Sequence, residues 1–360
     1  MCAAQPQNLQ SRSPSIPDPR DLRPFQPCLL PNRNSTRRLS TCDSISDLLR
    51  FGCMRFTLLL KAFRPLAGSK DRRFRHIDDE YEITERIDND ASMNVVRLGR
   101  HRETGDRVAV KAVMKKTRAA ADQEELVFRQ MAHPSLVRLI DVFEDKKCIY
   151  FVMEHCTGGD LIDLIEYCGG RLSQADAITV CKQLVNAVCF MHSKSIVHSD
   201  LKPSNIMVSG PNLIVKLIDF GASRVTSGSS YVQVTQGSPE FMAPEVLERS
   251  QLGFKSDIWA IGIILFIMVF GFSPMNPMGK PYCEIHSALH SRVRSGFQPT
   301  TKPGFGAFFP QSISCSQEMK DLIAWLLSYD PDTRPTASDL LRHPLLRSAL
   351  PKGILSAPAS

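Results

Sequence analysis

Four short motifs occur in order along the chain, and together they constrain its fold and chemistry more than any other feature. They are VAVK at 108–111, VHSDLKPSN at 197–205, IDFG at 218–221 and APE at 243–245. Each motif alone would turn up readily by chance. Their spacing is more specific, because 89 residues separate Lys111 from Asp200 and 19 more separate Asp200 from Asp219. The ordered set therefore indicates one functional domain that spans all four motifs.

The hydrophobic pattern changes at Gly158 and Gly159. Before them, alternating stretches rich in β-branched residues predict strands within 81–100 and at 107–114, 136–143 and 148–153, with one helix at 119–131. After them the pattern is mainly helical, with helices expected at 160–167, 174–193, 256–270, 316–327 and 337–341. We therefore expect an α+β fold in which a small β-rich lobe precedes a larger helical lobe.

Charge and cysteine content argue against several classes of protein. The net charge is +7, but residues 1–76 carry 14 Lys and Arg against 5 Asp and Glu, so the remainder carries −2. A nearly neutral globular part argues against a nucleic-acid-binding fold, and we expect no nucleic acid as partner. The 11 cysteines include no C-x-x-C pair, which argues against a zinc site and a disulfide framework. Reduced thiols indicate a cytoplasmic protein.

No stretch of the sequence predicts secretion or a membrane span. The N-terminus lacks a charged start followed by an apolar stretch, so we expect no signal peptide. The longest apolar run, residues 258–272, has 15 residues. A transmembrane helix needs about 18 or more. This run is therefore expected to be a buried core helix.

The four motifs resemble those of the eukaryotic protein-kinase family. The resemblance extends over about 265 residues, and its motifs are specific as an ordered set. It implies the bilobal protein-kinase fold, with a kinase domain at 77–345 that divides into an N-lobe at 77–155 and a C-lobe at 156–345. It also implies ATP and Mg²⁺ as cofactors, and a protein that carries a Ser or Thr hydroxyl as substrate.

The resemblance assigns the binding of the ATP α- and β-phosphates to Lys111. Its ammonium would be held by Glu124, which lies ten residues before Pro134, as the corresponding glutamate does in the family. Glu125 is the alternative partner. The need for such a lysine is physical, because phosphoryl transfer depends on neutralising and positioning the phosphates.

The remaining catalytic roles fall on the two later motifs. Asp219 is a hard oxygen ligand for Mg²⁺, and Asn205 would complete the metal site. Asp200 would orient the substrate hydroxyl and accept its proton. Lys202 would reach the transferring γ-phosphate.

The resemblance also predicts the walls of the ATP pocket. Ile87, Val95 and Ala109 would form its roof, and Met207 would form its floor. Met153 would be the gatekeeper, and Glu154 and Cys156 would offer backbone groups of the hinge. Asp160 would reach the ribose or a basic substrate residue. Two further residues are expected to be structural. These are Asp257 and Arg334, the latter as the partner of Glu245.

Several details are similar to one class of kinase. The K-P-x-N form after Asp200 resembles Ser/Thr kinases, and Ser238 stands where that class keeps a hydroxyl bonded to the aspartate and lysine. IDFG, EFMAPE at 240–245 and LLRHP at 340–344 are most similar to the calcium/calmodulin-dependent group, in its myosin light chain, titin/obscurin and death-associated branch. That branch implies calmodulin or a cytoskeletal protein as partner. Ser199 replaces the arginine that most kinases use to bind a phosphorylated loop, so we expect another mode of control.

The arm at 1–76 has a different character from the domain. Seven prolines lie among its first 40 residues, so we expect disorder. RRLS at 37–40 has the form of a phosphorylation motif. Residues 48–64 mix apolar and basic residues, and two interpretations stay open: an amphipathic helix that binds calmodulin, a membrane surface or the kinase domain, or a packed or poorly ordered segment. We favour the second, because the hydrophobic residues keep no clean helical face. Residues 346–360 form a short tail.

The loop that should cover the phosphates departs from the family pattern. The family has G-x-G-x-x-G there, whereas this chain has Asp88, Asp90 and Met93 at the three glycine positions. Glycine lets backbone amides approach phosphates closely. A carboxylate about 5 Å from a phosphate charge would cost about 3 kcal/mol at an effective dielectric constant of about 20.

Two functions from different classes are therefore considered. The first is a Ser/Thr kinase with weakened ATP binding, favoured by the retained catalytic residues. The alternative is a pseudokinase that serves as a binding scaffold, favoured by the loop without glycine. A small-molecule kinase is disfavoured by the APE motif and the helical lobe.

Overall fold

The structure is a computed structural model of the chain, and it describes residues 76–87, 95–226, 232–233, 238–275, 309–310 and 312–348. The predictions for segment 48–64, for nearly all of the arm at 1–76 and for the tail after residue 348 lie outside the described residues. The same holds for Asp88, Asp90 and Met93. Within the described ranges, no helix combines the length and the apolar character that crossing a membrane requires.

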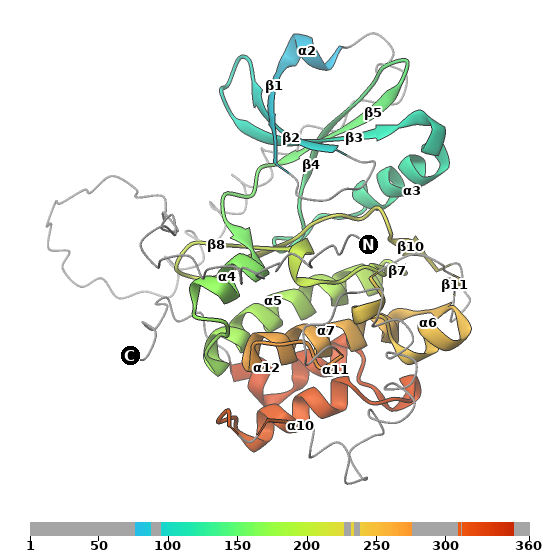
Figure 1. Cartoon of the computed structure of the whole chain (residues 1–360). Helices are drawn as coiled ribbons and strands as arrows, with labels where there is room; N and C mark the ends of the chain where they lie inside the picture. The colour runs from blue at the N-terminus through green and yellow to red at the C-terminus, as the bar shows by residue number, and fades with distance from the viewer. Residues whose placement is uncertain are drawn as a thin grey trace, which may run out of the picture. The chain divides into compact units, whose positions relative to one another are not determined.

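Five antiparallel strands form a sheet in the N-terminal part of the described chain (Figure 1). They are β1 (Tyr81–Arg86), β2 (Val95–His101), β3 (Arg107–Met114), β4 (Leu139–Glu144) and β5 (Cys148–Glu154), in the order β1-β2-β3-β5-β4. Successive side chains of a strand point to opposite faces. Ala109 and Lys111 of β3 therefore face one side of the sheet, and Val108 and Val110 face the other.

Each face of this sheet has its own apolar packing. Helix α2 (Ile77–Glu80) precedes β1, and Ile77 joins a small cluster with Val108 and Val110 on one face. Helix α3 (Arg118–Phe128) follows β3 after a 3₁₀ turn, η2 (Lys115–Thr117), and its buried residues belong to the main core. Helix α3 ends at Phe128, three residues before the predicted end, because the chain continues in turns there.

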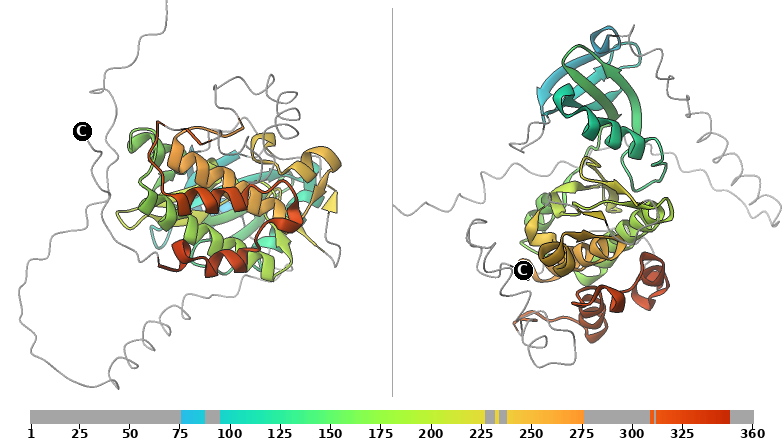
Figure 2. Two further views of the ribbon diagram at one scale, coloured as in Figure 1. Left: turned by 90° about the horizontal axis from the view of Figure 1, so that it is seen from below. Right: turned by 90° about the vertical axis from the view of Figure 1, so that its right-hand side faces the viewer.

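The second part of the described chain is mainly helical, as predicted (Figures 1 and 2). Its helices are α4 (Leu161–Tyr167), α5 (Gln174–Ser193), α6 (Pro244–Arg249), α7 (Phe254–Phe270), α10 (Gln317–Leu326), α11 (Ala337–Arg342) and α12 (Pro344–Ser348). An antiparallel sheet followed by helices is the architecture of the bilobal protein-kinase fold, and the predicted α+β class is confirmed.

Helix α7 is the buried core helix that the apolar run predicts. It carries 14 buried residues among 17 and packs against both α5 and α10. The apolar run continues to Phe272, but the helix ends at Phe270. Gly271 takes a left-handed backbone conformation with φ +80°, and its N–H bonds to the Ile267 carbonyl. Glycine adopts this conformation without steric cost and so terminates the helix.

Short strand pairs bring the two later catalytic motifs side by side. The strands are β6 (Gly159–Asp160), β7 (Ile196–Val197), β8 (Ile206–Ser209), β9 (Ile214–Leu217), β10 (Arg224–Val225), β11 (Val232–Gln233) and β12 (Gln251–Leu252). Pairing of β7 with β10 and of β8 with β9 brackets both motifs. Three 3₁₀ turns, η3 (Pro203–Asn205), η4 (Pro239–Phe241) and η5 (Pro331–Thr333), connect neighbouring elements.

Candidate active site

Lys111 on β3 is held between two carboxylates. Its Nζ lies 2.7 Å from Glu124 Oε1 on α3 and 2.7 Å from Asp219 Oδ1 after β9. Lys111 is 5% exposed and Glu124 is 2% exposed. Burial alone would lower the pKa of the Lys111 ammonium, but the two carboxylates outweigh it and raise the pKa. Lys111 is therefore a buried cation with a fixed position.

Of the two glutamates considered as the partner of Lys111, Glu124 makes the contact. The Glu125 carboxylate instead accepts a hydrogen bond from Arg129 Nε at 2.7 Å. Helical residues are rotated by about 100° from one to the next, so only one of the two can face β3. Glu124 shares the buried face of α3 with Ala121 and Val127. This spacing of three residues is a sequence signal that favours Glu124.

Asp219 lies in a left-handed backbone conformation, with φ +60°, which residues other than glycine seldom adopt. Its Oδ1 accepts hydrogen bonds from Lys111 Nζ at 2.7 Å and from the Gly221 N–H at 3.2 Å. Burial opposes ionisation, but the Lys111 charge prevails and lowers the pKa of Asp219 to about 2. A Cβ atom at Gly221 would lie 3.3 Å from both Asp219 Oδ1 and Lys111 Nζ. A side chain at position 221 would therefore crowd the ion pair and displace it by a few tenths of an ångström.

Phe220 connects α3 to the segment 197–205, which we call the catalytic loop. This loop in turn contacts α7. Its buried ring makes edge contacts with Phe128 of α3, at 5.0 Å between ring centroids, and with His198, at 5.7 Å. Asp257 of α7 in turn accepts hydrogen bonds from the backbone N–H groups of His198 at 2.9 Å and Ser199 at 3.0 Å. The loop is thereby fixed from both sides by buried groups, and Asp257 has the structural role that the sequence predicts.

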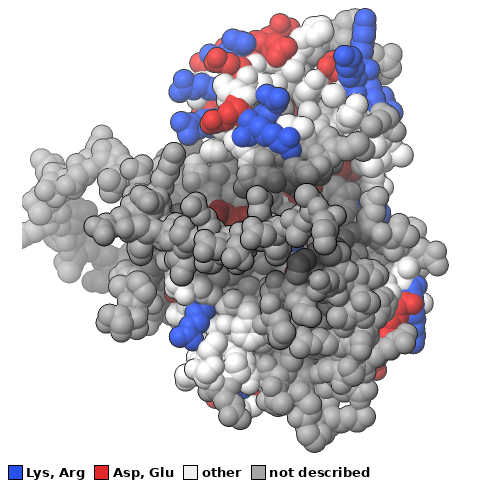
Figure 3. Space-filling view, in the orientation of Figure 1, with Lys and Arg blue, Asp and Glu red and all other residues white. Residues whose placement is uncertain are grey.

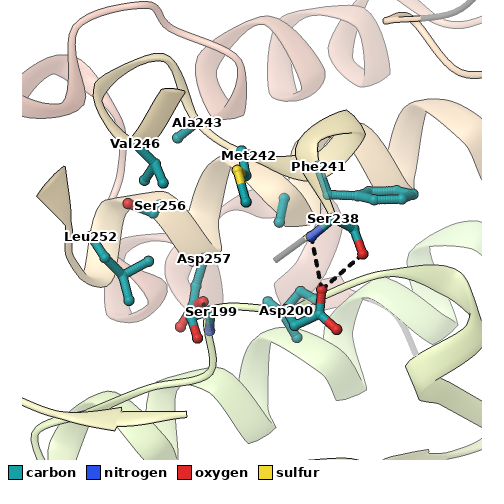
Figure 4. A pocket seen from close by; sticks show the side chains of 12 residues that line it. Ser199, Asp200, Ser238, Phe241, Met242, Ala243, Val246, Leu252, Ser256 and Asp257 are labelled. Atoms are coloured by element: carbon teal, nitrogen blue, oxygen red, sulfur yellow. Dashed lines mark hydrogen bonds between the residues drawn. The ribbon is translucent and has the colours of Figure 1, made fainter. Parts of the chain in front are cut away.

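A second polar cluster surrounds Asp200. Its Oδ2 lies 2.9 Å from Lys202 Nζ. Its Oδ1 accepts hydrogen bonds from the Ser238 hydroxyl at 2.9 Å and N–H at 3.2 Å, which Figure 4 draws as dashed lines. Lys202 Nζ donates to the Ser238 hydroxyl at 3.3 Å. Asn205 Nδ2 donates to the Asp200 carbonyl at 2.8 Å. The contacts expected of Ser238 with the aspartate and the lysine are present.

Beside this cluster, a small pocket lies between the catalytic loop, α6 and α7. Ser199 lines it together with Asp200 and Asp257, as Figure 4 shows. The Ser199 hydroxyl donates to the Ala222 carbonyl, so it is engaged with the loop backbone. Such a short side chain cannot replace an arginine that reaches out to a phosphate.

Asn205 and Asp219 are the residues expected to hold Mg²⁺, and their remaining donor atoms fit that ion. The Asn205 amide nitrogen bonds to Asp200, which leaves Oδ1 as an acceptor. Asp219 is partly buried, but 44% of its side chain is exposed, so its carboxylate remains accessible. Magnesium in phosphate sites uses one or two such groups together with phosphates and water. In the described ranges, no group of three or more His, Cys, Asp or Glu side chains could hold a metal by itself.

Four apolar residues expected around the adenine ring lie on the sheet side. Ala109 of β3 and Met153 of β5 are direct partners in the strand register, and Met153 is 7% exposed. Ile87 and Val95 flank the segment 88–94, whose structure is not among the described residues. Ile87 is 40% exposed.

The hinge after β5 contains a contact that the sequence does not signal. The Glu154 carboxylate accepts a hydrogen bond from Lys216 Nζ at 2.6 Å and another from the Arg138 N–H at 2.9 Å. The Glu154 N–H also donates to the Arg138 carbonyl at 3.0 Å, so this N–H is not available for the predicted hinge role. Cys156 lies outside the helices and strands. Among the described residues, neither its N–H nor its carbonyl forms a hydrogen bond with another backbone group, so both are available to a ligand.

Asp160 has a structural task that we did not predict. Its Oδ1 accepts hydrogen bonds from the N–H groups of Ile162 at 2.8 Å and Asp163 at 3.0 Å, so it caps α4. The Asp163 side chain accepts the Asp160 N–H in return, which completes a capping box. Asp160 also pairs with Met207 between β6 and β8. The sequence contains a signal for this cap, because Asp160 and Asp163 are three residues apart at the start of the apolar stretch 161–165.

A buried ion pair supports the helical part. Both terminal nitrogens of Arg334 bond to the Glu245 carboxylate, at 2.7 and 2.8 Å, as expected. Arg334 is 2% exposed, and its guanidinium lies 5.0 Å from the ring centroid of Trp259. This pair connects the APE motif, at the start of α6, to the segment before α11.

Comparison with known proteins agrees with this geometry. The chain belongs to the protein kinase domain family, whose profile matches residues 81–346. It is 32% identical over 296 residues to a probable myosin light chain kinase from Dictyostelium discoideum, covering 80% of this chain and 71% of that protein. It is 35% identical over 273 residues to human calcium/calmodulin-dependent protein kinase type 1B, covering 74% and 75%. It is also 32% identical to human serine/threonine-protein kinase DCLK3, covering 76% of this chain but only 41% of that protein.

These relatives narrow the class. The chain is a protein serine/threonine kinase, similar to the calcium/calmodulin-dependent group that its motifs resemble. Kinases of this family use ATP with Mg²⁺ and act on protein substrates.

Proposed function

We propose that this kinase transfers the γ-phosphate of ATP to a Ser or Thr hydroxyl of a protein, and that it binds ATP more weakly than a kinase with a glycine-rich loop. The observation that carries the proposal is the position of Lys111, within 2.7 Å of both Glu124 and Asp219. Phosphoryl transfer requires positioning and charge neutralisation more than covalent chemistry, so an ordered set of charges supports turnover.

Asp200 is the proposed base. Its carboxylate would orient the substrate hydroxyl and accept its proton, while Ser238 and Lys202 fix its rotamer through the contacts at 2.9 Å. Lys202 is placed beside the same carboxylate, so its ammonium would stabilise negative charge that develops on the transferred group.

Lys111, Asn205 and Asp219 are the proposed phosphate and metal ligands. Lys111 would keep Glu124 as its anchor and would exchange part of its contact with Asp219 for phosphate oxygens. Asn205 Oδ1 and the Asp219 carboxylate would hold Mg²⁺, which supplies charge neutralisation to the phosphates.

The adenine would lie between the sheet and β8. Ile87, Val95 and Ala109 would cover one ring face and Met207 the other, with Met153 at the rear. The backbone of Glu154 and Cys156 would provide hydrogen bonds, and Asp160 would reach the ribose or a basic substrate residue with the oxygen not used as a helix cap.

We attribute the weakened binding of ATP to Asp88, Asp90 and Met93. Initial rates of transfer to a basic peptide, measured against Mg²⁺-ATP concentration, test this assignment. The variant Asp88→Gly/Asp90→Gly/Met93→Gly should lower the half-saturating ATP concentration by about tenfold or more, since each removed carboxylate relieves up to about 3 kcal/mol of repulsion. An unchanged half-saturating ATP concentration would show that these three residues do not weaken ATP binding.

A scaffold without catalysis is the second candidate, and the same loop favours it. Thermal unfolding with and without millimolar Mg²⁺-ATP separates the two functions, because a ligand that binds only the folded state raises its melting temperature. A rise that Lys111→Met abolishes supports the kinase. Absence of any rise in the wild-type protein supports the scaffold.

Calmodulin is a proposed partner, through residues 48–64. The support is the apolar and basic composition of this segment together with the similarity of the chain to calcium/calmodulin-dependent protein kinases. Titration of a 48–64 peptide with calmodulin tests it. Binding in Ca²⁺ that is lost with a Ca²⁺ chelator is expected, and no binding in Ca²⁺ would remove this partner.

A further inference from the structure

A pocket of about 450 Å³ lies at one end of the five-stranded sheet, away from the Lys111 cluster. It forms where β1 and β3 begin, where β2 and β5 end, and just before β4. Val108 and Tyr81, which line it, belong to the small apolar cluster on the face opposite to Lys111. We call this the rear pocket. Its volume is within the range of about 300–1,000 Å³ that ligand sites occupy.

Two arginines line the rear pocket without a partner for their guanidinium groups. Arg107 and Arg138 are exposed, and within the described residues neither side chain donates a hydrogen bond or forms an ion pair. Other arginines of the same part of the chain are engaged. Arg97, Arg100 and Arg102 each donate to a backbone carbonyl, while Arg118 and Arg129 bind glutamates. The two guanidiniums of the rear pocket are thus available for a ligand.

The carboxylates beside these arginines have other partners. Glu154 is bound by Lys216 Nζ at 2.6 Å, and Asp106 accepts a hydrogen bond from the Thr104 hydroxyl at 2.8 Å. On the face that Figure 3 shows, basic and acidic side chains are mixed over the sheet. Lys216 balances the charge of Glu154, whereas Asp106 has no cationic partner among the described residues. Two arginines therefore face one uncompensated carboxylate, which leaves a local excess of positive charge in this pocket.

Two histidines in the pocket wall agree with this charge. Burial and the nearby Arg107 charge lower the pKa of His155, as a positive potential would. The Nδ1 atom of His101 accepts hydrogen bonds from the N–H groups of Glu103 at 3.3 Å and Thr104 at 3.2 Å. The proton of the neutral His101 ring therefore belongs on Nε2, which makes that atom a donor.

We propose that the rear pocket binds a phosphorylated serine or threonine in a segment of another protein. Arg107 and Arg138 would hold the phosphate, because guanidinium forks match phosphate oxygens and two of them balance a dianion. Ile140, which is partly buried and packs on the buried Tyr81 and Val108, offers apolar surface for the neighbouring side chain of the peptide.

The charge of the chain decides which peptide is favoured. Its own N-terminal residues 1–76 carry a net +9 and include the phosphorylation motif at 37–40, so they suit a positive pocket poorly. An acidic phosphorylated segment of a partner is complementary. This proposal does not depend on phosphate transfer by the kinase, and it holds for a scaffold as well.

Fluorescence anisotropy with the full chain tests it. The probe is a labelled peptide with one phosphoserine, a neighbouring leucine and flanking aspartates. The controls are the same peptide with Ser or Glu in place of the phosphoserine. Inorganic phosphate serves as the competitor. The phosphopeptide should bind at least about tenfold more tightly than either counterpart. Equal binding of the three peptides would overturn the proposal, and competition by inorganic phosphate at equal concentration would reassign the pocket to free phosphate.

Matched variants locate the site. Arg107→Gln and Arg138→Gln should each weaken phosphopeptide binding by about 10- to 100-fold, since each removes hydrogen bonds to a charged group. Arg102→Gln removes the same charge outside the pocket and should change binding less than about threefold. An equal loss in Arg102→Gln, or tighter binding of a 37–40 phosphopeptide from this chain, would overturn the assignment.

Discussion

Lys111 Nζ lies 2.7 Å from Asp219 Oδ1, although 108 residues separate the two in the sequence. The contact joins β3 of the sheet to the segment after β9 in the helical part. It also accounts for the ionised state of Asp219, whose pKa falls to about 2 beside the lysine. An ion pair at this place links the stability of the fold to the arrangement needed for phosphate transfer.

This ion pair makes stability depend on pH. The folded-state pKa of Asp219 is lowered from 3.8 to about 2, so its contribution is present above the ordinary value and is lost as the pH falls toward 2. In Lys111→Met the pKa of Asp219 should return upward, and the free energy of unfolding should then depend less on pH below about 5. Denaturant unfolding from pH 6 to pH 3 measures this. Parallel curves for the two proteins would contradict the pairing.

Glu124 should matter more than its neighbour Glu125. Glu124→Gln removes the charge that fixes Lys111, so we expect kcat/KM for ATP to fall by about 10- to 100-fold. Glu125→Gln breaks a pair within one helix to Arg129, which is worth about 0.3–0.5 kcal/mol. Steady-state kinetics of the two variants in one peptide assay decide the matter. Equal losses would mean that the register of α3 differs from the structure.

Gly221→Ala should impair transfer without unfolding the protein. The added Cβ would lie 3.3 Å from Asp219 Oδ1 and Lys111 Nζ, so the ion pair must shift by a few tenths of an ångström. Because displacements of about 1 Å cost about 100-fold in rate, we expect a loss of about tenfold. Thermal unfolding of the same sample controls for folding. Full activity in Gly221→Ala would contradict the close approach.

Arg334 should carry stability rather than chemistry. Arg334→Met leaves the buried Glu245 carboxylate unpaired, and removal of one partner of a buried pair costs about 3–5 kcal/mol. Arg342→Met is the matched control, because its side chain is 73% exposed and its pair with Asp339 is worth less than about 1 kcal/mol. Urea unfolding midpoints of both variants provide the comparison. Similar midpoints would contradict the burial of the Arg334 pair.

The elements that the sequence predicts well are those set by local pattern. Helix α5 was predicted at its observed bounds, because its apolar spacing is a local signal. The cap from Ser173, whose side chain accepts the Asp176 N–H, was not predicted. Lys111, Asp200 and Asp219 were predicted as site residues from motifs, and the structure brings Lys111 and Asp219 into contact. Helix α7 was predicted as buried from its composition alone.

What the sequence does not predict depends on contacts between distant residues. The pair of Glu154 with Lys216 joins positions 62 residues apart, and neither residue carries a motif. The rear pocket is formed by the ends of several strands, so it exists only once the sheet register is known. The sequence already favoured Glu124 over Glu125 through its spacing to Pro134, and the orientation of α3 supplies the physical reason, because Glu124 lies on the buried face of the helix.

The most direct test of the account is phosphate transfer from labelled Mg²⁺-ATP to a basic Ser peptide, comparing the wild-type chain with Asp200→Asn at saturating ATP. Asp200→Asn keeps the shape of the site and removes the proposed base, so both proteins should show the same ATP-induced rise in melting temperature. The account predicts transfer by the wild type and a loss of at least about 100-fold in Asp200→Asn. Equal transfer by the two proteins would contradict it.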